Sequence, residues 1–414
     1  MVSVEGTPAG LVLFGPTYYP SILSSSLITF KSVLLASFIC SAATVAWYAT
    51  SLFAPSLEPP ACSAAVRAVA YETLHHYNPS LKNVTIYGTG GTIAGRGASI
   101  TQTTGYSIGN TTIYDLIGGV PDLPNIANIA AVQVSNVESG EINAKILLEL
   151  NKLIQDDLAQ PTTQGVVVTH GTDTLEETAF FLDLTMLSHK PVVVVGAMRP
   201  STATSADGPL NLFQAVKLAV TPEARDRGAM VTFNDRITSA YYVSKNHANA
   251  LDTFYAKDQG HLGFFLNQVP NFYFTPSTPT AKPFFDISRL NLKTLPQVDI
   301  LFGHQDSNPA LIRAAASSGA KGIVFAGPGA GYWTEAGRAV AKEVFDEMAI
   351  PMVFSTRTGK GFVPPFPPFG EGGEWRIAGS TLDPQKCRIL LQLAIATGME
   401  AQEIGSLFES LQTR

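Results

Sequence analysis

The chain has few cysteines for its length, with only Cys40, Cys62 and Cys387 among 414 residues. They form no CxxC pair and no dense pattern, which argues against a disulfide-stapled scaffold and a thiolate metal site. At most one bridge, from Cys62 to Cys387, could form in the folded part, and geometry that a sequence does not show would decide it. We therefore expect neither a metal nor a disulfide framework.

Basic residues are also scarce. Lys and Arg number 27 against 33 Asp and Glu, the net charge is −6, and no run of basic residues occurs. Nucleic-acid binding depends on clustered Lys and Arg that neutralise phosphates, so we expect no nucleic-acid partner. Hydrophobic residues make up 45% of the chain, and the length favours two domains. A small-molecule substrate is the better starting hypothesis.

One segment near the N-terminus lacks charge altogether, from residue 32 to residue 54. At about 1.5 Å per residue such a helix could span the bilayer core. It could be a retained signal anchor, a signal peptide cleaved near residues 49–54, or a buried core helix. The Asn-X-Thr sequons at Asn83 and Asn110 fit secretion. We predict a leader over 1–61 and a protein that is secreted, or anchored to a membrane facing the secretory lumen.

Short β-rich runs alternate with helical stretches from residue 83 onward. The predicted strands are apolar on both faces, as in a parallel sheet, and cover 84–87, 165–169, 191–195 and 322–326. The predicted helices cover 141–158, 174–187, 209–219, 335–348 and a last one that opens at Asp383-Pro384 and stops near Gly398. This alternation predicts a layered α/β fold with a mainly parallel sheet.

Prolines break the alternation between residues 275 and 296. We interpret this segment as a linker. It would separate a larger N-terminal α/β domain, 83–274, from a smaller C-terminal α/β domain, 297–414.

A glycine-rich motif, Gly88-Thr-Gly-Gly-Thr-Ile-Ala-Gly95, directly follows the first predicted strand. Glycines allow a sharp turn and would leave Thr92 at the carboxyl end of a strand, where open α/β sheets bind ligands. The spacing does not fit the dinucleotide motif GxGxxG, and no Gly-Lys-Ser/Thr ending makes it a phosphate-binding loop. A structural turn whose threonine caps a helix remains an alternative.

A second motif, Thr169-His-Gly-Thr-Asp-Thr-Leu-Glu-Glu177, again joins a buried strand to a helix. It would place Thr172 and Asp173 at the same edge of the sheet. We interpret Glu176 and Glu177 as helix N-terminal charges. His170 could act as a general base, but a lone histidine beside a strand end is more often hydrogen-bonded packing.

The two motifs together resemble the signatures of the asparaginase/glutaminase family, specifically its bacterial type II-like and secreted fungal-type members. The likeness continues in three further stretches, 196–209, Ser244-Lys245 and 380–388, and covers residues 83–414. The resemblance implies an amidohydrolase without a cofactor that releases ammonia from free L-asparagine, with minor activity on glutamine. It also implies a homotetramer of paired active-site dimers.

The resemblance assigns roles to individual residues. Thr92 would be the nucleophile that forms an acyl-enzyme, with Tyr106 beside it on a flexible lid over residues 93–107. Thr172, Asp173 and Lys245 would form a second hydrogen-bonded set. To act as a base Lys245 must be neutral, which burial favours and Asp173 opposes, so the identity of the base stays open.

The same resemblance places the substrate. Asp173 would bind its α-ammonium and Ser139 its α-carboxylate, while Gly91 and Thr172 would also contact it. Backbone N–H groups around Thr92 and Thr172 could stabilise the oxyanion. Recognition of both charges selects a free amino acid over a peptide.

The sequence departs from the family pattern in three places. Gly140 stands where many relatives have a substrate-contacting glutamine. Asp306 aligns with an asparagine that a neighbouring subunit supplies, and Glu371 is the best match for the glutamate that partners Tyr106. Two rival hypotheses remain: an amidotransferase component that acts on tRNA-bound glutamate, and a catalytically silent, membrane-anchored binding protein.

Overall fold

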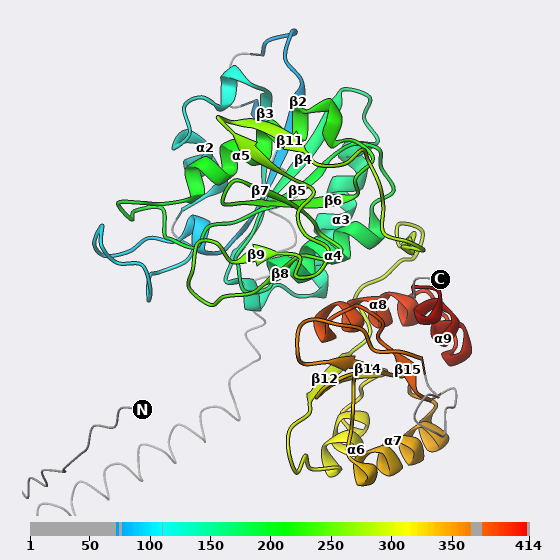
Figure 1. Cartoon of the computed structure of the whole chain (residues 1–414). Helices are drawn as coiled ribbons and strands as arrows, with labels where there is room; N and C mark the ends of the chain where they lie inside the picture. Colours follow the sequence, from blue (N-terminus) through cyan, green and yellow to red (C-terminus); the bar gives the residue numbers. More distant parts are fainter. Residues whose placement is uncertain (1–71, 74–76, 110, 366–374, 412–414) are drawn as a thin grey trace, which may run out of the picture. The chain divides into compact units, whose positions relative to one another are not determined.

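A computed structural model describes residues 72–73, 77–109, 111–365 and 375–411 (Figure 1). The predicted leader, with its uncharged segment 32–54, lies outside these residues, as does Asn110. The sequon at Asn83 begins a strand, where the Asn83 side chain accepts a hydrogen bond from Asn128 and Thr85 is buried. This sequon therefore lies in a sheet and not on the surface loop that glycosylation favours.

The larger sheet has nine strands in the order β1-β3-β2-β4-β5-β6-β7-β10-β11. Pairing is parallel across its centre, from β3 to β6, and antiparallel at both edges. In chain order the strands are β1 Glu72–Thr73, β2 Asn83–Gly90, β3 Asn128–Val137, β4 Thr163–Thr169, β5 Val192–Val195, β6 Ala229–Phe233, β7 Arg236–Ser239, β10 Gly263–Leu266 and β11 Val269–Phe272. A separate hairpin pairs β8, Ser244–Lys245, with β9, Phe254–Tyr255.

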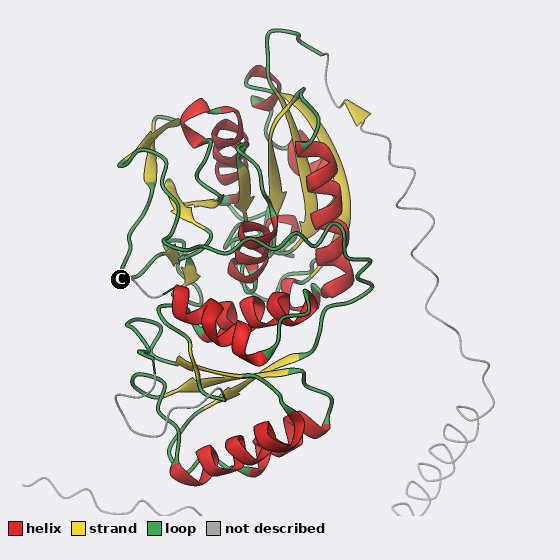
Figure 2. Ribbon diagram, turned by 90° about the vertical axis from the view of Figure 1, so that its right-hand side faces the viewer, coloured by secondary structure: helices red, strands yellow, loops and turns green. Residues whose placement is uncertain are grey.

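Helices cover both faces of this sheet because its central strands are apolar on both sides. In β4, Val166 and Val168 belong to one hydrophobic core and Val167, which points the opposite way, to another. The first core is closed by α3, Ala144–Leu158, and α4, Leu175–Thr185; the second by α2, Ile113–Gly118, and α5, Gly208–Val220. Figure 2 shows these helices flanking the strands.

The smaller sheet is parallel throughout, in the order β12-β13-β14-β15, with bounds Val298–Phe302, Gly322–Gly327, Met352–Thr356 and Ile377–Ala378. Its helices are α6 Ala310–Ser317, α7 Glu335–Met348, α8 Pro384–Ala396 and α9 Ala401–Ser410. Phe325 packs with α6 and α7, whereas Val324 faces the core that contains α8. Helix α8 also contacts α4, so one continuous core joins the two sheets.

The predicted mixed α/β class, with a larger sheet followed by a smaller parallel one, is confirmed. Helix α7 has the predicted bounds, and Asp383 caps α8 by accepting from the backbone N–H of Lys386, with Pro384 at the first helical position. The antiparallel edge strands and α9 were not predicted, and neither were the parallel strands β3, β6, β12, β14 and β15.

The proline-rich segment 275–296 packs against the protein instead of running free. Phe285 donates its backbone N–H to the carbonyl of Leu184 at 2.9 Å, and the Phe285 side chain is buried. Lys282 forms an ion pair with the buried carboxylate of Asp183 at 2.9 Å. The segment is therefore anchored on α4.

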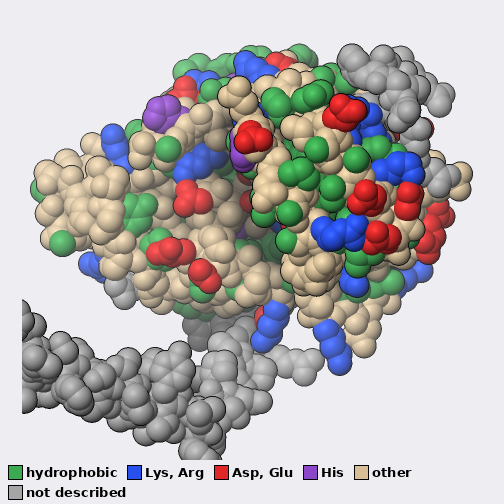
Figure 3. Space-filling model, turned by 90° about the horizontal axis from the view of Figure 1, so that it is seen from below, with side chains coloured by type: hydrophobic (Ala, Val, Ile, Leu, Met, Phe, Trp, Pro, Cys, Tyr) green, Lys and Arg blue, Asp and Glu red, His purple; other side chains and the backbone are tan. Residues whose placement is uncertain are grey.

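The outer face of α6 and α7 carries side chains of both charges (Figure 3). Arg313 pairs with Glu347 at 2.6 Å, and Lys342 pairs with Asp346 at 2.6 Å. Because these pairs are exposed to solvent, each contributes little to stability, about 0–1 kcal/mol.

Candidate active site

The two glycine- and threonine-rich loops meet at the carboxyl edge of the large sheet, because β2 and β4 are parallel neighbours. Gly91 has φ 83°, and a Cβ atom added there would lie 2.1 Å from the Cα of Gly171. Glycine is thus required at both loops. Thr92 and Thr172 follow directly and line the same cavity of about 440 Å³.

Thr92 begins a short 3-10 helix, Thr92–Ala94, and its side-chain oxygen lies 2.7 Å from the hydroxyl of Tyr106. Thr89, the other threonine of the motif, is buried and donates its hydroxyl to the carbonyl of Thr169 at 2.8 Å. Thr92 is therefore the threonine of this loop whose hydroxyl faces the cavity.

The segment that carries Tyr106 is held at both ends. Arg96 and Ser107 pair as an antiparallel bridge, and the carbonyl of Gly95 accepts from the backbone N–H of Ser201 at 2.9 Å. Burial raises the pKa of Tyr106, and the nearby carboxylates of Asp173, Asp207 and Glu138 add to this, while the hydrogen bond with Thr92 lowers it. Tyr106 therefore keeps its proton at neutral pH.

A second cluster joins the β4 loop to the β8 hairpin. The ammonium of Lys245 donates to the hydroxyl of Thr172 at 3.1 Å and to a carboxylate oxygen of Asp173 at 2.6 Å. The Lys245 side chain is 14% exposed, whereas that of Asp173 is 79% exposed. The ammonium of Lys245 is thus mostly covered, while the carboxylate of Asp173 stays largely exposed and lines the cavity.

Ser139 also lines the cavity, next to the loop that follows β4. It starts a 3-10 helix after β3, is buried, and its carbonyl accepts from the hydroxyl of Thr174 at 2.7 Å. The Gly140 position beside it is open, because an added Cβ would meet nothing within 4 Å. A larger side chain would therefore fit at this position without a clash.

His170 takes no part in the cavity. It is fully buried, with Nδ1 2.7 Å from the carbonyl of Gly171 and Nε2 2.8 Å from the hydroxyl of Thr178. Burial lowers its pKa to about 4. Its prediction as hydrogen-bonded packing is confirmed.

Glu176 is more than a helix N-terminal charge, which corrects our interpretation. Its side chain is buried, and its carboxylate accepts the backbone N–H of Lys245. Burial raises its pKa to about 7, against the opposing effect of Lys386. Glu177, by contrast, is partly exposed and pairs with Arg388 at 2.9 Å. No local sequence pattern marks this difference, because the groups around Glu176 lie about 70 and 210 positions further along the chain.

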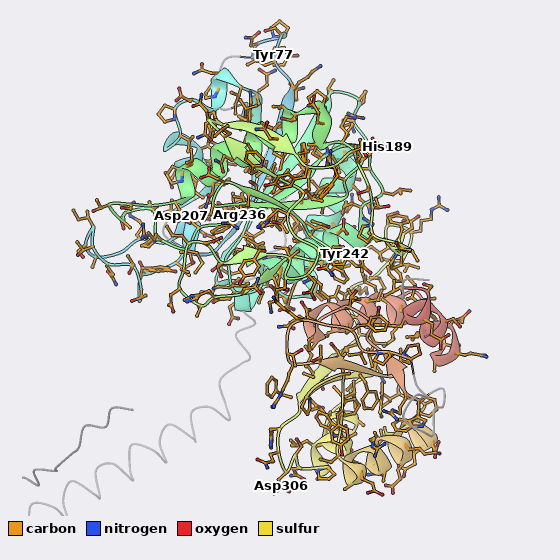
Figure 4. The ribbon with its side chains drawn as sticks, in the orientation of Figure 1. Tyr77, His189, Asp207, Arg236, Tyr242 and Asp306 are labelled. Carbon is orange, nitrogen blue, oxygen red and sulfur yellow. The ribbon has the colours of Figure 1, made fainter. Side chains whose placement is uncertain are left out.

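Three predicted features fall away from the cavity or outside the structure. Asp306 is exposed on the loop after β12, with φ 57° (Figure 4). Glu371 and Cys62 lie outside the described residues. The thiol of Cys387 is buried on α8, where burial raises its pKa.

Comparison with known proteins supports one family. The model of the asparaginase N-terminal domain matches residues 83–278, and that of the glutaminase/asparaginase C-terminal domain matches 297–408. L-asparaginase 2-3 of Saccharomyces cerevisiae is 49% identical over 336 residues, which cover 81% of this chain and 91% of that protein. The chain belongs to the asparaginase family. Another member, L-asparaginase 2 of Bacillus subtilis, is 46% identical over 79% of this chain and 86% of its own length.

A solved structure of the asparaginase family also matches. It is titled as a probable cytoplasmic L-asparaginase from Campylobacter jejuni, with a TM-score of 0.73 and 40% identity, and the match covers 80% of this chain and 99% of that one. This comparison contradicts the predicted secretion or membrane anchoring, which we correct here. Within the part of the chain that the structure describes, no helix has the length and apolar character needed to cross a bilayer.

Proposed function

We propose that this chain is an L-asparaginase that hydrolyses the side-chain amide of free L-asparagine to L-aspartate and ammonia, with minor activity on glutamine. Family membership supports the reaction class. One observation carries the mechanism: the Thr92–Tyr106 pair and the Thr172–Asp173–Lys245 cluster line the same cavity.

In this proposal the Thr92 oxygen attacks the amide carbon of the substrate. Its proton passes to the oxygen of Tyr106, while Tyr106 gives its own proton to the leaving nitrogen, which departs as ammonia. The relay requires no phenolate, in keeping with the raised pKa of Tyr106. Water then attacks the resulting ester, and the same relay returns a proton to Thr92 as aspartate leaves.

The second cluster serves binding and charge stabilisation. Asp173 binds the α-ammonium of the substrate and Ser139 its α-carboxylate. The backbone N–H of Gly91 is donated to the carbonyl of Val137 at 2.9 Å, so the N–H groups of Thr92 and Thr172 are the donors for the developing oxyanion. The covered ammonium of Lys245 polarises the Thr172 hydroxyl. A cavity of about 440 Å³ is ample for one free amino acid.

We further propose that the chain works as a homotetramer of paired dimers, as the family resemblance implies. Light scattering of the purified protein would then give the mass of about four chains. A monomer with full activity would contradict this assembly.

The decisive experiment compares two threonines of one motif. Thr92→Ala should abolish ammonia release from asparagine and leave the thermal unfolding midpoint unchanged. The matched control is Thr89→Val, which removes a buried hydrogen bond worth about 1 kcal/mol but should keep turnover. Full activity in Thr92→Ala would disprove the mechanism.

A further inference from the structure

The buried ammonium of Lys386 contacts the two residues that precede Lys245. Lys386, on α8, is 2% exposed and donates to the carbonyl of Val243 at 2.6 Å and to the hydroxyl of Ser244 at 3.3 Å. Both acceptors are on the chain that leads into Lys245. The motif around Lys386 has no part in the mechanism described so far.

A carboxylate completes this contact. Asp383 accepts from the ammonium of Lys386 at 3.0 Å and from the hydroxyl of Ser244 at 2.9 Å. It also caps α8. The first turn of α8 therefore binds the backbone of Val243 and the side chain of Ser244, just before Lys245.

Glu176, on α4, holds the next residue, Lys245. Its buried carboxylate accepts the backbone N–H of Lys245, and it lies within the electrostatic reach of Lys386 and Asp383. Glu176 stands one helical turn after the loop that carries Thr172. Successive positions of one short segment are thus tied to α4 and α8.

The hairpin needs such support. Strand β8 has two residues and pairs with only two of β9, which is too little to fix its own position. Lys386 and Glu176 are buried and Asp383 is mostly covered, and ionisable groups are costly to place in such surroundings, so simple packing of α4 on α8 would not require them. Their arrangement around β8 indicates that these groups fix the position of this strand and do not only join α4 to α8.

We propose that Glu176 and Lys386 are positioning residues that hold the backbone of Lys245, so that its ammonium reaches the cavity in the required place. The C-terminal part of the chain thereby contributes to the active site without touching substrate. This inference rests on the function proposed above.

The test is a double-mutant cycle on the full chain with asparagine as substrate. Lys386→Met should lower kcat tenfold to a hundredfold and change KM less than threefold. In a Lys245→Met background, which already lacks the ammonium, Lys386→Met should change the residual kcat less than twofold. The control Lys342→Met removes an exposed ammonium, and we expect it to leave kcat unchanged.

Assays are run well below each variant's unfolding midpoint. If Lys386→Met fails to fold, Ser244→Ala is the milder variant: it removes one link to Asp383 and should lower kcat threefold to tenfold. Unchanged kcat in a folded variant, or losses that multiply in the double variant, would overturn the inference. Failure of the proposed function is separate, because then the wild-type chain would release no ammonia or Thr92→Ala would retain activity.

Discussion

The hydroxyl of Tyr106 lies 2.7 Å from the side-chain oxygen of Thr92, although 13 residues separate them in the chain. The intervening segment is closed by the Arg96–Ser107 bridge, and the hydroxyl of Thr202 accepts from the backbone N–H of Gly97 at 2.9 Å. The segment therefore holds the hydroxyl of Tyr106 beside Thr92. Preorganisation of this kind lowers the entropic cost of the chemical step.

Tyr106→Phe removes the relay and keeps the ring. We expect kcat for asparagine to fall by about 10²- to 10⁴-fold, as for loss of a proton-transfer group, while KM changes little. Steady-state kinetics measures both quantities. If kcat stays within threefold of wild type, Tyr106 does not carry the proton.

The contributions of the substrate's α-ammonium and α-carboxylate to binding should be measurable separately by mutation. Asp173→Asn weakens recognition of the α-ammonium, and Ser139→Ala that of the α-carboxylate. Each lost charge-assisted hydrogen bond costs about 1.5–3 kcal/mol, which corresponds to a rise in KM of roughly tenfold to a hundredfold. Succinamic acid, which lacks the ammonium, should bind wild type poorly and be indifferent to Asp173→Asn. Equal sensitivity of both substrates to this variant would contradict the assignment.

The buried ion pair between Lys282 and Asp183 should matter for stability. Lys282→Met leaves a carboxylate that is 2% exposed without its ammonium, and we expect a loss of about 3 kcal/mol in the free energy of unfolding. Urea denaturation measures the loss. Adding Asp183→Asn removes the unpaired charge and should recover part of it. A single variant as stable as wild type would show that the segment 275–296 is not anchored here.

Two buried groups should give opposite dependences of stability on pH. The pKa of His170 is about 4 in the folded chain and 6.5 when the imidazole is free in water, so the stability it contributes is present above pH 6.5 and is lost as pH falls towards 4. The pKa of Glu176 is raised to about 7 from 4.5, so burial of its charge reduces stability as pH rises from 4.5 to 7. In wild type the two effects oppose one another.

Variants separate these contributions. His170→Gln should lose acid sensitivity between pH 6.5 and 4, whereas Glu176→Gln should be more stable than wild type above pH 7, each by on the order of 2 kcal/mol. Lys386, Asp383 and Glu177 face Glu176 and are unchanged in both variants. Unfolding midpoints at pH 5 and pH 8 provide the measurement. Parallel pH profiles for wild type and both variants would contradict the assignment.

Sequence patterns predict three of the five parallel strands at the centre of the large sheet, β2, β4 and β5, but not β3 and β6 or the antiparallel edges. The continuous apolar runs of β4, β5 and β13 identify strands buried on both faces, and the capping residues Thr334 and Asp383 fix helix starts locally. The edge strands β7 and β11 each pair with the preceding strand across a two-residue turn, at Phe233–Arg236 and Leu266–Val269, whereas β10 pairs with β7 across a longer separation, at Gly263 and Ile237. These strands are short, and their pairing depends on context more than on intrinsic strand propensity.

The same distinction applies to the site. Thr92, Thr172 and Asp173 lie in loops that glycines and strand ends make recognisable, and the structure brings them to one cavity with Tyr106 and Lys245. The interpretation of Glu176 as a helix N-terminal charge is incomplete, because its environment also includes α8, more than 200 residues later. The prolines of segment 275–296 predict a linker but do not reveal that Phe285 within it is buried.

The contact between Gly91 and Gly171 has a consequence for how this site can change. A Cβ atom on Gly91 would lie 2.1 Å from the Cα of Gly171, and one on Gly171 would lie 2.8 Å from the Cβ of Ser139 and 3.0 Å from the Cα of Gly91, so a side chain at either position would displace its neighbours. A substitution in one of the loops that carry Thr92 and Thr172 therefore requires a compensating change in its surroundings. Changes in substrate choice are open at other residues that line the cavity, such as Thr103 and Ile108, while the contact between the two loops tolerates little variation.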